Sequence, residues 1–282
     1  MELEVLVDFG PKPNEETLNE TLKKLKNTEG VKEVQYKDGT FMVETVLPSS
    51  LVLNMVSEST GKRTVLQGFG ESQSAVASVT SALGCGKSSG VMGVVRFQQT
   101  AEGPLVVDGT VDGLKPGEHG LHVHEAGDLS QGCKSIGGHY NPLGTVHGAP
   151  TDGRDRRHAG DLGNIVADDM GRATFRILDD VLKVWEIVGR SISISDRRDD
   201  LGRGDSPESK VDGASGDSVA CGIIARSAGI FQNPKRICAC DGVTVWDERD
   251  RPLAGAGRRS TSPCCNRELG GGDAQKKTCC KV

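Results

Sequence analysis

The histidines of this chain are crowded into one short stretch. All 6 lie between His119 and His158, in a chain of 282 residues. His122-Val123-His124 directs both imidazoles to one face if the segment is a β-strand, because strand side chains alternate with a period of two. Imidazoles gathered this closely favour a metal site over separate surface histidines bonded to backbone carbonyls. The sequence therefore favours a fold that gathers this stretch around a metal.

A set of zinc ligands follows the histidine pair. His139, His147 and His158 lie in sequence typical of loops, and Asp161 comes shortly after the last of them. Three imidazoles and one carboxylate form a suitable tetrahedral set for Zn²⁺. The sequence therefore predicts a zinc site made of these four residues.

The 9 cysteines are not spaced like a secreted disulfide framework. Cys238 and Cys240 flank a single alanine, so two thiolates in one short turn would suit Cu⁺ or thiol exchange, with a redundant surface pair as the alternative. The adjacent pairs near the C-terminus rarely form disulfides within the pair, and they are either auxiliary copper ligands or incidental tail composition. These pairs are Cys264-Cys265 and Cys279-Cys280.

Charge and hydropathy exclude several classes of partner. A formal net charge of -5 gives no general reason to bind nucleic acid or an anionic membrane. No apolar run approaches the roughly 20 residues of a membrane-spanning helix. The N-terminus begins Met1-Glu2-Leu3-Glu4, which lacks the basic segment of a signal peptide. We expect a cytoplasmic protein with no transmembrane segment, and minor mitochondrial or nuclear pools are an open alternative.

Residues 1–70 predict a ferredoxin-like α+β domain. Strands are indicated at Leu3–Val7, Val31–Tyr36, Thr40–Thr45 and near Thr64, with helices after Asn14 and from about Ser50. The Asp38-Gly39 dipeptide between the second and third strands favours a tight hairpin. The resulting order is β-α-β-β-α-β.

The rest of the chain divides into three parts. Residues 71–89 are rich in Ser, Gly and Ala and predict a linker. Residues 90–230 alternate short β-runs with Gly-rich turns, which predicts an all-β sandwich or barrel, and the 4% aromatic content and 38 glycines agree. Residues 231–282 form a cysteine-bearing tail, which we expect to be disordered after Pro252.

Three motifs in the β-rich region resemble the Cu/Zn superoxide dismutase family. They are Gly120-Leu121-His122-Val123-His124-Glu125-Ala126-Gly127-Asp128, Gly138-His139-Tyr140-Asn141-Pro142 and His158-Ala159-Gly160-Asp161-Leu162-Gly163-Asn164, with a related cysteine segment at Ala220-Cys221-Gly222. The resemblance implies a Greek-key barrel. It also implies copper-side ligands His122, His124 and His139, a zinc site at His139, His147, His158 and Asp161, a Cys133–Cys221 disulfide, and Asp199 as a carboxylate that orients ligands.

The chain departs from that family at two positions. The resemblance places Ser195 where a fourth copper-binding histidine belongs, and a hydroxyl is a poor copper ligand beside imidazole. It also places Ser218 where an arginine would attract the superoxide anion, with Asp217 beside it. Both changes argue against an enzyme and indicate a vestigial copper site.

Over nearly its whole length the chain resembles the copper chaperones for superoxide dismutase. Gly222-Ile223-Ile224-Ala225-Arg226-Ser227-Ala228-Gly229 and Cys238-Ala239-Cys240-Asp241-Gly242 carry the likeness. It implies Cu⁺ delivery by Cys238 and Cys240 to Cu/Zn superoxide dismutase, in a heterodimer formed through Gly222, Ile223, Ile224 and Ala225. A homodimer of this chain is an open alternative.

The first domain departs from the chaperone pattern. The loop from Phe9 to Asn14 has no Cys-x-x-Cys motif. We therefore interpret the domain as a docking or scaffold module rather than a copper-binding one. Two rival functions are a divergent dismutase with an incomplete copper site and a zinc-only scaffold.

Overall fold

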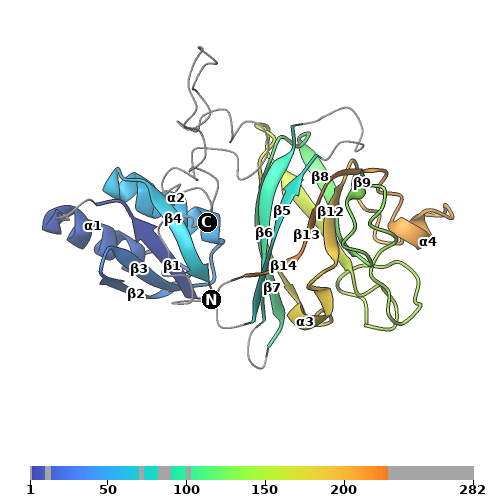
Figure 1. Ribbon diagram of the computed structural model, residues 1–282, viewed down its shortest axis with the longest axis horizontal. Coiled ribbons are helices and arrows are strands. Elements are labelled where there is room, and N and C mark those ends of the chain that lie inside the picture. Colours follow the sequence, from blue (N-terminus) through green and yellow to red (C-terminus); the bar gives the residue numbers. More distant parts are fainter. Residues whose placement is uncertain (1, 10–13, 70–72, 82–89, 100–102, 228–282) are drawn as a thin grey trace, which may run out of the picture. The chain divides into compact units, whose positions relative to one another are not determined.

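The computed structural model describes residues 2–9, 14–69, 73–81, 90–99 and 103–227 (Figure 1). Cys238 and Cys240, the paired tail cysteines and the order of the tail beyond Pro252 lie outside these residues. So does Cys85, in the predicted linker.

The N-terminal elements form the predicted ferredoxin-like domain. They are β1 (Glu2–Val7), α1 (Glu15–Lys26), β2 (Val31–Lys37), β3 (Thr40–Thr45), α2 (Ser49–Thr60) and β4 (Thr64–Phe69). The strands form one antiparallel sheet in the order β2-β3-β1-β4.

Local chemistry explains the boundaries of these elements. The Asn14 side chain accepts a hydrogen bond of 3.0 Å from the backbone nitrogen of Glu16, which caps the start of α1. Asp38 and Gly39 both have positive φ, 50° and 85°, as a tight hairpin turn between β2 and β3 requires. The prediction of a tight Asp-Gly hairpin at this position is confirmed.

The remaining elements form an antiparallel barrel, which confirms the predicted all-β architecture. The strands are β5 (Ser74–Thr80), β6 (Met92–Gln99), β7 (Leu105–Asp112), β8 (Gly117–His124), β9 (Ser130–Cys133), β10 (Asp161–Ala167), β11 (Ala173–Asp179), β12 (Ser191–Ser195), β13 (Ser218–Ile223) and β14 (Ala225–Ser227). Short helices α3 (Val184–Ile187) and α4 (Ser209–Asp212) lie in the connections. The order is β13-β12-β8-β10-β11-β7-β6-β5-β14, and a further pairing of β13 with β5 closes the ring.

The predicted linker at residues 71–89 is wrong in its first half. Ser74–Thr80 forms β5, which pairs with β6 along its whole length and with β13 at Thr80. Ala75, Ala77 and Val79 are fully buried in the barrel core. The small side chains made the segment resemble a linker by composition, although their alternation has the period of a strand.

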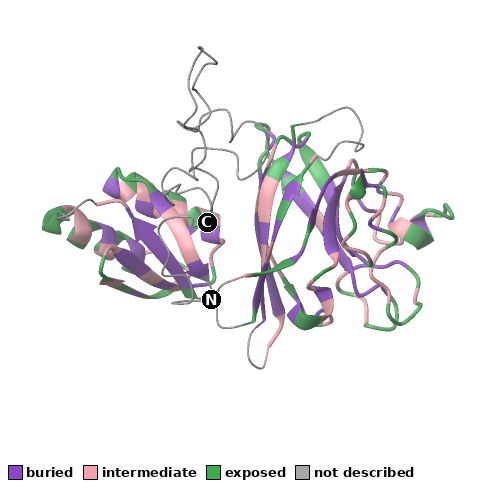
Figure 2. Ribbon diagram, viewed as in Figure 1, coloured by how far each residue is buried: buried purple, intermediate pink, exposed green. Residues whose placement is uncertain are grey.

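The core of the barrel fixes the strands that carry the histidines. Leu121 and Val123 of β8 and Ile192 and Ile194 of β12 are fully buried among the core side chains. Figure 2 shows this buried interior running along the barrel strands. His122 and His124 lie on the opposite face of β8 from these leucine and valine side chains, as period-two alternation dictates. The long connection from β9 to β10 covers that face and carries three further site histidines.

Candidate metal centre

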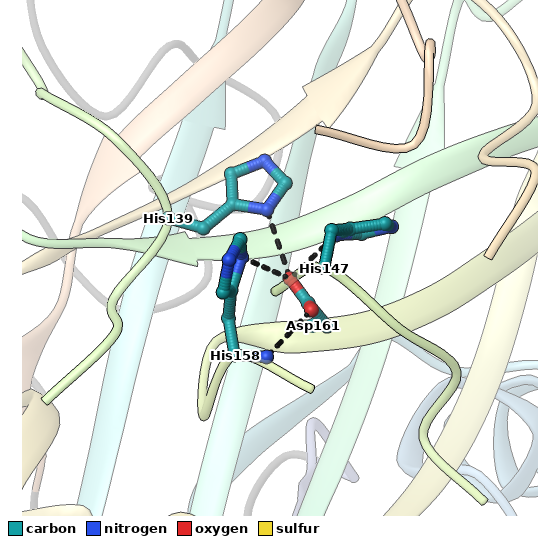
Figure 3. Close-up of side chains that lie close together, drawn as sticks. All are labelled: His139, His147, His158 and Asp161. Atoms are coloured by element: carbon teal, nitrogen blue, oxygen red, sulfur yellow. Dashed lines mark hydrogen bonds and ion pairs between the residues drawn. The ribbon is translucent and has the colours of Figure 1, made fainter. Parts of the chain in front are cut away.

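The four predicted zinc ligands converge on one point (Figure 3). Oδ1 of Asp161, the first residue of β10, lies 2.8 Å from Nδ1 of His139, 3.0 Å from Nδ1 of His147 and 3.3 Å from Nδ1 of His158. The ligand atoms of the four residues all lie within 4.8 Å of one another. These residues are called the zinc side below.

The donor set of the zinc side fits Zn²⁺. Nδ1 of His147 and Nδ1 of His158 are buried and make no hydrogen bond, although both point toward Asp161. Buried polar atoms are normally paired, so unpaired nitrogens that meet at a carboxylate oxygen indicate a missing common partner. Three imidazole nitrogens and one carboxylate oxygen are the ligand types of a closed tetrahedral zinc site.

The charges of the zinc side also favour a cation. Burial acts to lower the pKa of His147, but contacts with the carboxylates of Asp161 and Asp199 outweigh it and raise the pKa to about 9. Burial acts to raise the pKa of Asp161, and the three surrounding imidazoles hold it far below its ordinary value instead. The buried carboxylates of Asp161 and Asp199 thus favour a nearby positive charge, which a divalent metal would supply.

His122, His124 and His139 form the other half of the cluster, called the copper side below. The rings of His122 and His139 stack with their centroids 3.9 Å apart, and those of His124 and His139 are 5.1 Å apart. Burial and the neighbouring His139 lower the pKa of His124 to about 4, while burial and His122 lower the pKa of His139 to about 4. The structure therefore gathers all three predicted copper-side residues as neutral imidazoles at pH 7.

Asp199 connects the two sides. Its carboxylate accepts hydrogen bonds of 2.9 Å from Nε2 of His122 and 2.8 Å from Nε2 of His147. These bonds engage Nε2 of each ring and fix the ring orientations, which leaves Nδ1 as the nitrogen that can face a metal. A Cβ at Gly213 would lie 1.8 Å from Oδ1 of Asp199, so glycine is required at that close approach. The structure thus places Asp199 where the resemblance expected an orienting carboxylate.

The two serines singled out by the resemblance lie opposite each other. Ser195 of β12 pairs with Ser218 of β13 in the barrel sheet. The Ser195 hydroxyl is buried and lies 3.1 Å from the Ser215 hydroxyl, and Ser218 is half-buried. Both departures from the dismutase pattern therefore lie at one location, beside the copper side.

The expected cysteine pair is joined. Cys133 of β9 and Cys221 of β13 form a disulfide with a Cα–Cα distance of 5.8 Å. Both cysteines pack with Ile136 in a small buried cluster. The bridge fastens the start of the β9–β10 connection, which carries the loop-borne zinc ligands, to the closed barrel.

Sequence reasoning missed two residues of this centre. Arg157 is fully buried, forms an ion pair with Asp179 and donates a 2.6 Å hydrogen bond to the backbone oxygen of Asp161. Nothing in the Arg156-Arg157 doublet indicates that the second arginine is internal. Ser193 is the other, and its hydroxyl lies 2.8 Å from Nε2 of His124. The Ser-Ile-Ser-Ile-Ser alternation of β12 could have indicated that the serines share one face of a strand, opposite the isoleucines.

The barrel and its two-sided histidine cluster define the class of protein. Residues 91–224 match the family model described as Copper/zinc superoxide dismutase (SODC). The crystal structure titled "Crystal Structure Analysis of the clock protein EA4" superposes with a TM-score of 0.50 at 37% identity, covering 58% of this chain and 100% of that chain. The β-rich half of the chain is therefore a Cu/Zn superoxide dismutase-like barrel.

Two relatives extend the match beyond the barrel. The copper chaperone for superoxide dismutase of Rattus norvegicus is 52% identical over 85% of this chain and 87% of its own length. The copper chaperone for superoxide dismutase of Homo sapiens is 50% identical over 85% of this chain and 87% of its own length. This chain belongs to the family of copper chaperones for superoxide dismutase. Among the described residues, no helix is long and apolar enough to cross a membrane.

Proposed function

We propose that this chain is a metallochaperone that delivers Cu⁺ to Cu/Zn superoxide dismutase and promotes formation of the client's disulfide. One observation carries the proposal: three histidines and an aspartate that suit zinc lie beside the copper-side histidines, in a chain of the copper chaperone family. The resemblance supports it further, because it implies that Ser195 replaces a fourth copper ligand. A barrel of this kind can keep the shape of a dismutase subunit without dismutase turnover.

The barrel would act as a rigid partner for the client. His139, His147, His158 and Asp161 would hold Zn²⁺, which fixes the loop by coordination and supplies no redox chemistry. Asp199 orients His147, and Cys133–Cys221 fastens the loop at its other end. The resulting surface is preorganised, which reduces the entropy cost of association.

The client would bind at the surface around β13 and β14. Among the four proposed interface residues, Ile223 and Ala225 are exposed, whereas Gly222 and Ile224 are buried and support them. Trp185 of α3 is 61% exposed and lines a hollow of about 350 Å³ together with Val184, Val188 and Arg226. An exposed tryptophan beside a hollow is a typical anchor of a protein interface.

Copper transfer and disulfide formation would use the tail. Cys238 and Cys240 would carry Cu⁺, a soft ion that prefers thiolates, to the client's histidines. In a separate step, a client thiolate would attack an oxidised Cys238–Cys240 pair to give a mixed disulfide. The second client thiolate would then displace the tail sulfur, so that two electrons pass from the client to the tail pair. The ferredoxin-like domain, without cysteines in its first loop, would serve docking rather than copper uptake.

Copper transfer is tested by mixing the Cu⁺-loaded chain with zinc-bound, disulfide-reduced superoxide dismutase and following dismutase activity. We expect activity only when both proteins are present. Cys238→Ser with Cys240→Ser should abolish activation while leaving heterodimer formation intact, and Cys264→Ser with Cys265→Ser is the matched control. Activation that survives the first pair of substitutions would contradict the tail mechanism. Activity of this chain alone would make it a divergent dismutase, and Ser195→His with Ser218→Arg should then raise the rate.

The proposed surface is tested separately by gel filtration with the client. Ile223→Glu places a charge at the exposed end of β13, next to β14, and should abolish the heterodimer, because an unpaired charge in an interface is costly to desolvate. Leu178→Glu is the matched control, since Leu178 is 61% exposed on β11, across the ring from β13. Equal loss of heterodimer in both variants would contradict this location.

A further inference from the structure

The strand β12 presents a row of serines to the histidine cluster. Ser191, Ser193 and Ser195 alternate with Ile192 and Ile194, and all five side chains are buried. The isoleucines pack in the barrel core. Ser193 pairs with His122 in the neighbouring strand β8, so the serine row faces the histidines. The serine row therefore extends beyond Ser195. The change of one copper ligand at Ser195 does not explain the hydroxyls of Ser191 and Ser193.

The hydrogen bonds of His124 fix which of its ring nitrogens carries a lone pair. Nδ1 lies 2.9 Å from the backbone oxygen of Gly137, and a carbonyl oxygen can only accept, so Nδ1 donates. Histidine binds a metal as the neutral imidazole, in which only one ring nitrogen carries a proton. Nε2 must then be the acceptor, and the Ser193 hydroxyl donates to it across 2.8 Å.

This bond and a metal bond at the same nitrogen exclude each other. A metal on an imidazole lies at about 2.0–2.1 Å along the nitrogen lone pair, which is the direction the Ser193 hydroxyl occupies. His124 is buried on strand β8, and its ring cannot turn away from the serine without losing its bond to Gly137. A copper ion at this nitrogen would therefore have to displace the Ser193 hydroxyl.

We propose that the Ser193 hydroxyl blocks the metal-binding nitrogen of His124, so that the barrel discriminates against copper while its zinc side stays open. This inference rests on the proposed function, because a chaperone that retained copper in its own barrel would withhold cargo from the client. This block acts in addition to the change at Ser195. Ser195 stands in place of a copper-binding histidine, whereas Ser193 bonds to His124, a histidine that is still present.

The test measures copper binding to the full chain, with no client present. The 7 cysteines outside the Cys133–Cys221 bridge are replaced by serine so that tail thiols neither bind nor reduce the probe ion. The zinc-loaded protein is titrated with Cu²⁺, and binding is followed by equilibrium dialysis and electron paramagnetic resonance. Ser195→His restores the missing ligand and brings the affinity into a measurable range. Adding Ser193→Ala should then raise Cu²⁺ affinity about tenfold, the factor expected for removing one competing buried hydrogen bond.

Ser193→Thr in the same background is the matched control, because it keeps the hydroxyl and should leave the affinity near that of Ser195→His alone. A second readout is nitrogen NMR of His124 in the zinc-loaded protein without copper. The Nε2 resonance should move in Ser193→Ala and should keep its position in Ser193→Thr. An unchanged copper affinity in Ser193→Ala would overturn the proposal. A lower affinity would also overturn it, because it would show that the Ser193 hydroxyl is a copper ligand. Failure of client activation has no bearing on these readouts, so the two proposals can fail separately.

Discussion

The zinc side and the copper side share His139 and are connected by Asp199, but they are built differently. The zinc side takes His147 and His158 from the long connection between β9 and β10 and brings them to Asp161 at the start of β10. The copper side takes His122 and His124 from the regular strand β8. On the zinc side the free nitrogens face a carboxylate, whereas on the copper side a serine hydroxyl bonds to His124. The zinc side thus draws two of its ligands from a connection between strands, whereas both unshared residues of the copper side lie on a strand of the barrel.

The largest effect should follow from removing the Asp161 carboxylate, on which the three zinc-side imidazoles converge. Asp161→Asn removes the charge that faces three imidazoles, and zinc affinity should fall by more than about 100-fold, the upper range for groups that merely support a ligand. Competition with a chelator, read by zinc stoichiometry, measures the change. Asp169→Asn, at an exposed position in the following turn, is the matched control. Retained zinc in Asp161→Asn would show that the zinc side does not work as a unit.

The second-largest effect should follow from loss of the disulfide. It should lower the stability of the loop that carries the zinc-side histidines. Cys133→Ser frees the start of the loop that carries His139, His147 and His158, and it should cost about 2–5 kcal/mol of unfolding free energy. Urea unfolding of the zinc-loaded and chelated forms measures this cost. Reductant should lower the stability of the native chain to the same extent and leave Cys133→Ser unchanged. If zinc affinity did not fall in the variant, the loop would be ordered without its anchor.

Asp199 tests whether the two sides are coupled. Asp199→Asn removes one acceptor from the pair of histidines, and zinc affinity should fall about 10–100-fold, as is typical for a carboxylate that orients a ligand. The same chelator competition applies, with Asp205→Asn at an exposed position as control. An effect as large as that of Asp161→Asn would mean that Asp199 itself acts as a ligand.

The two sides also differ in how far the sequence predicted them. The predicted zinc ligands carry side chains whose chemistry stands out, whereas Asp199 and the cysteine pair were expected only from the family resemblance, and the structure brings each set together. Ser193 and Arg157 did not stand out, because serine is common in strands and turns and one arginine of a doublet looks like the other. Only the tertiary packing shows that Arg157 is buried against Asp179. Composition likewise hid β5, since small residues such as Ser and Ala are typical of linkers but also occur in this buried strand.

The smallest effect should follow from Ser195→Ala. The Ser195 hydroxyl bonds to the Ser215 hydroxyl, and losing one neutral hydrogen bond should lower the unfolding free energy by about 1 kcal/mol or less. Zinc affinity should stay within about twofold of the native value, because none of the four zinc ligands bonds to this hydroxyl in the part of the chain that the structure describes. Urea unfolding and chelator competition measure the two quantities on one preparation. A fall in zinc affinity comparable to that of Asp199→Asn would show that the serine row supports the zinc side as well. Its small effect would instead mean that the copper side can vary in sequence while the barrel keeps its zinc-bound shape.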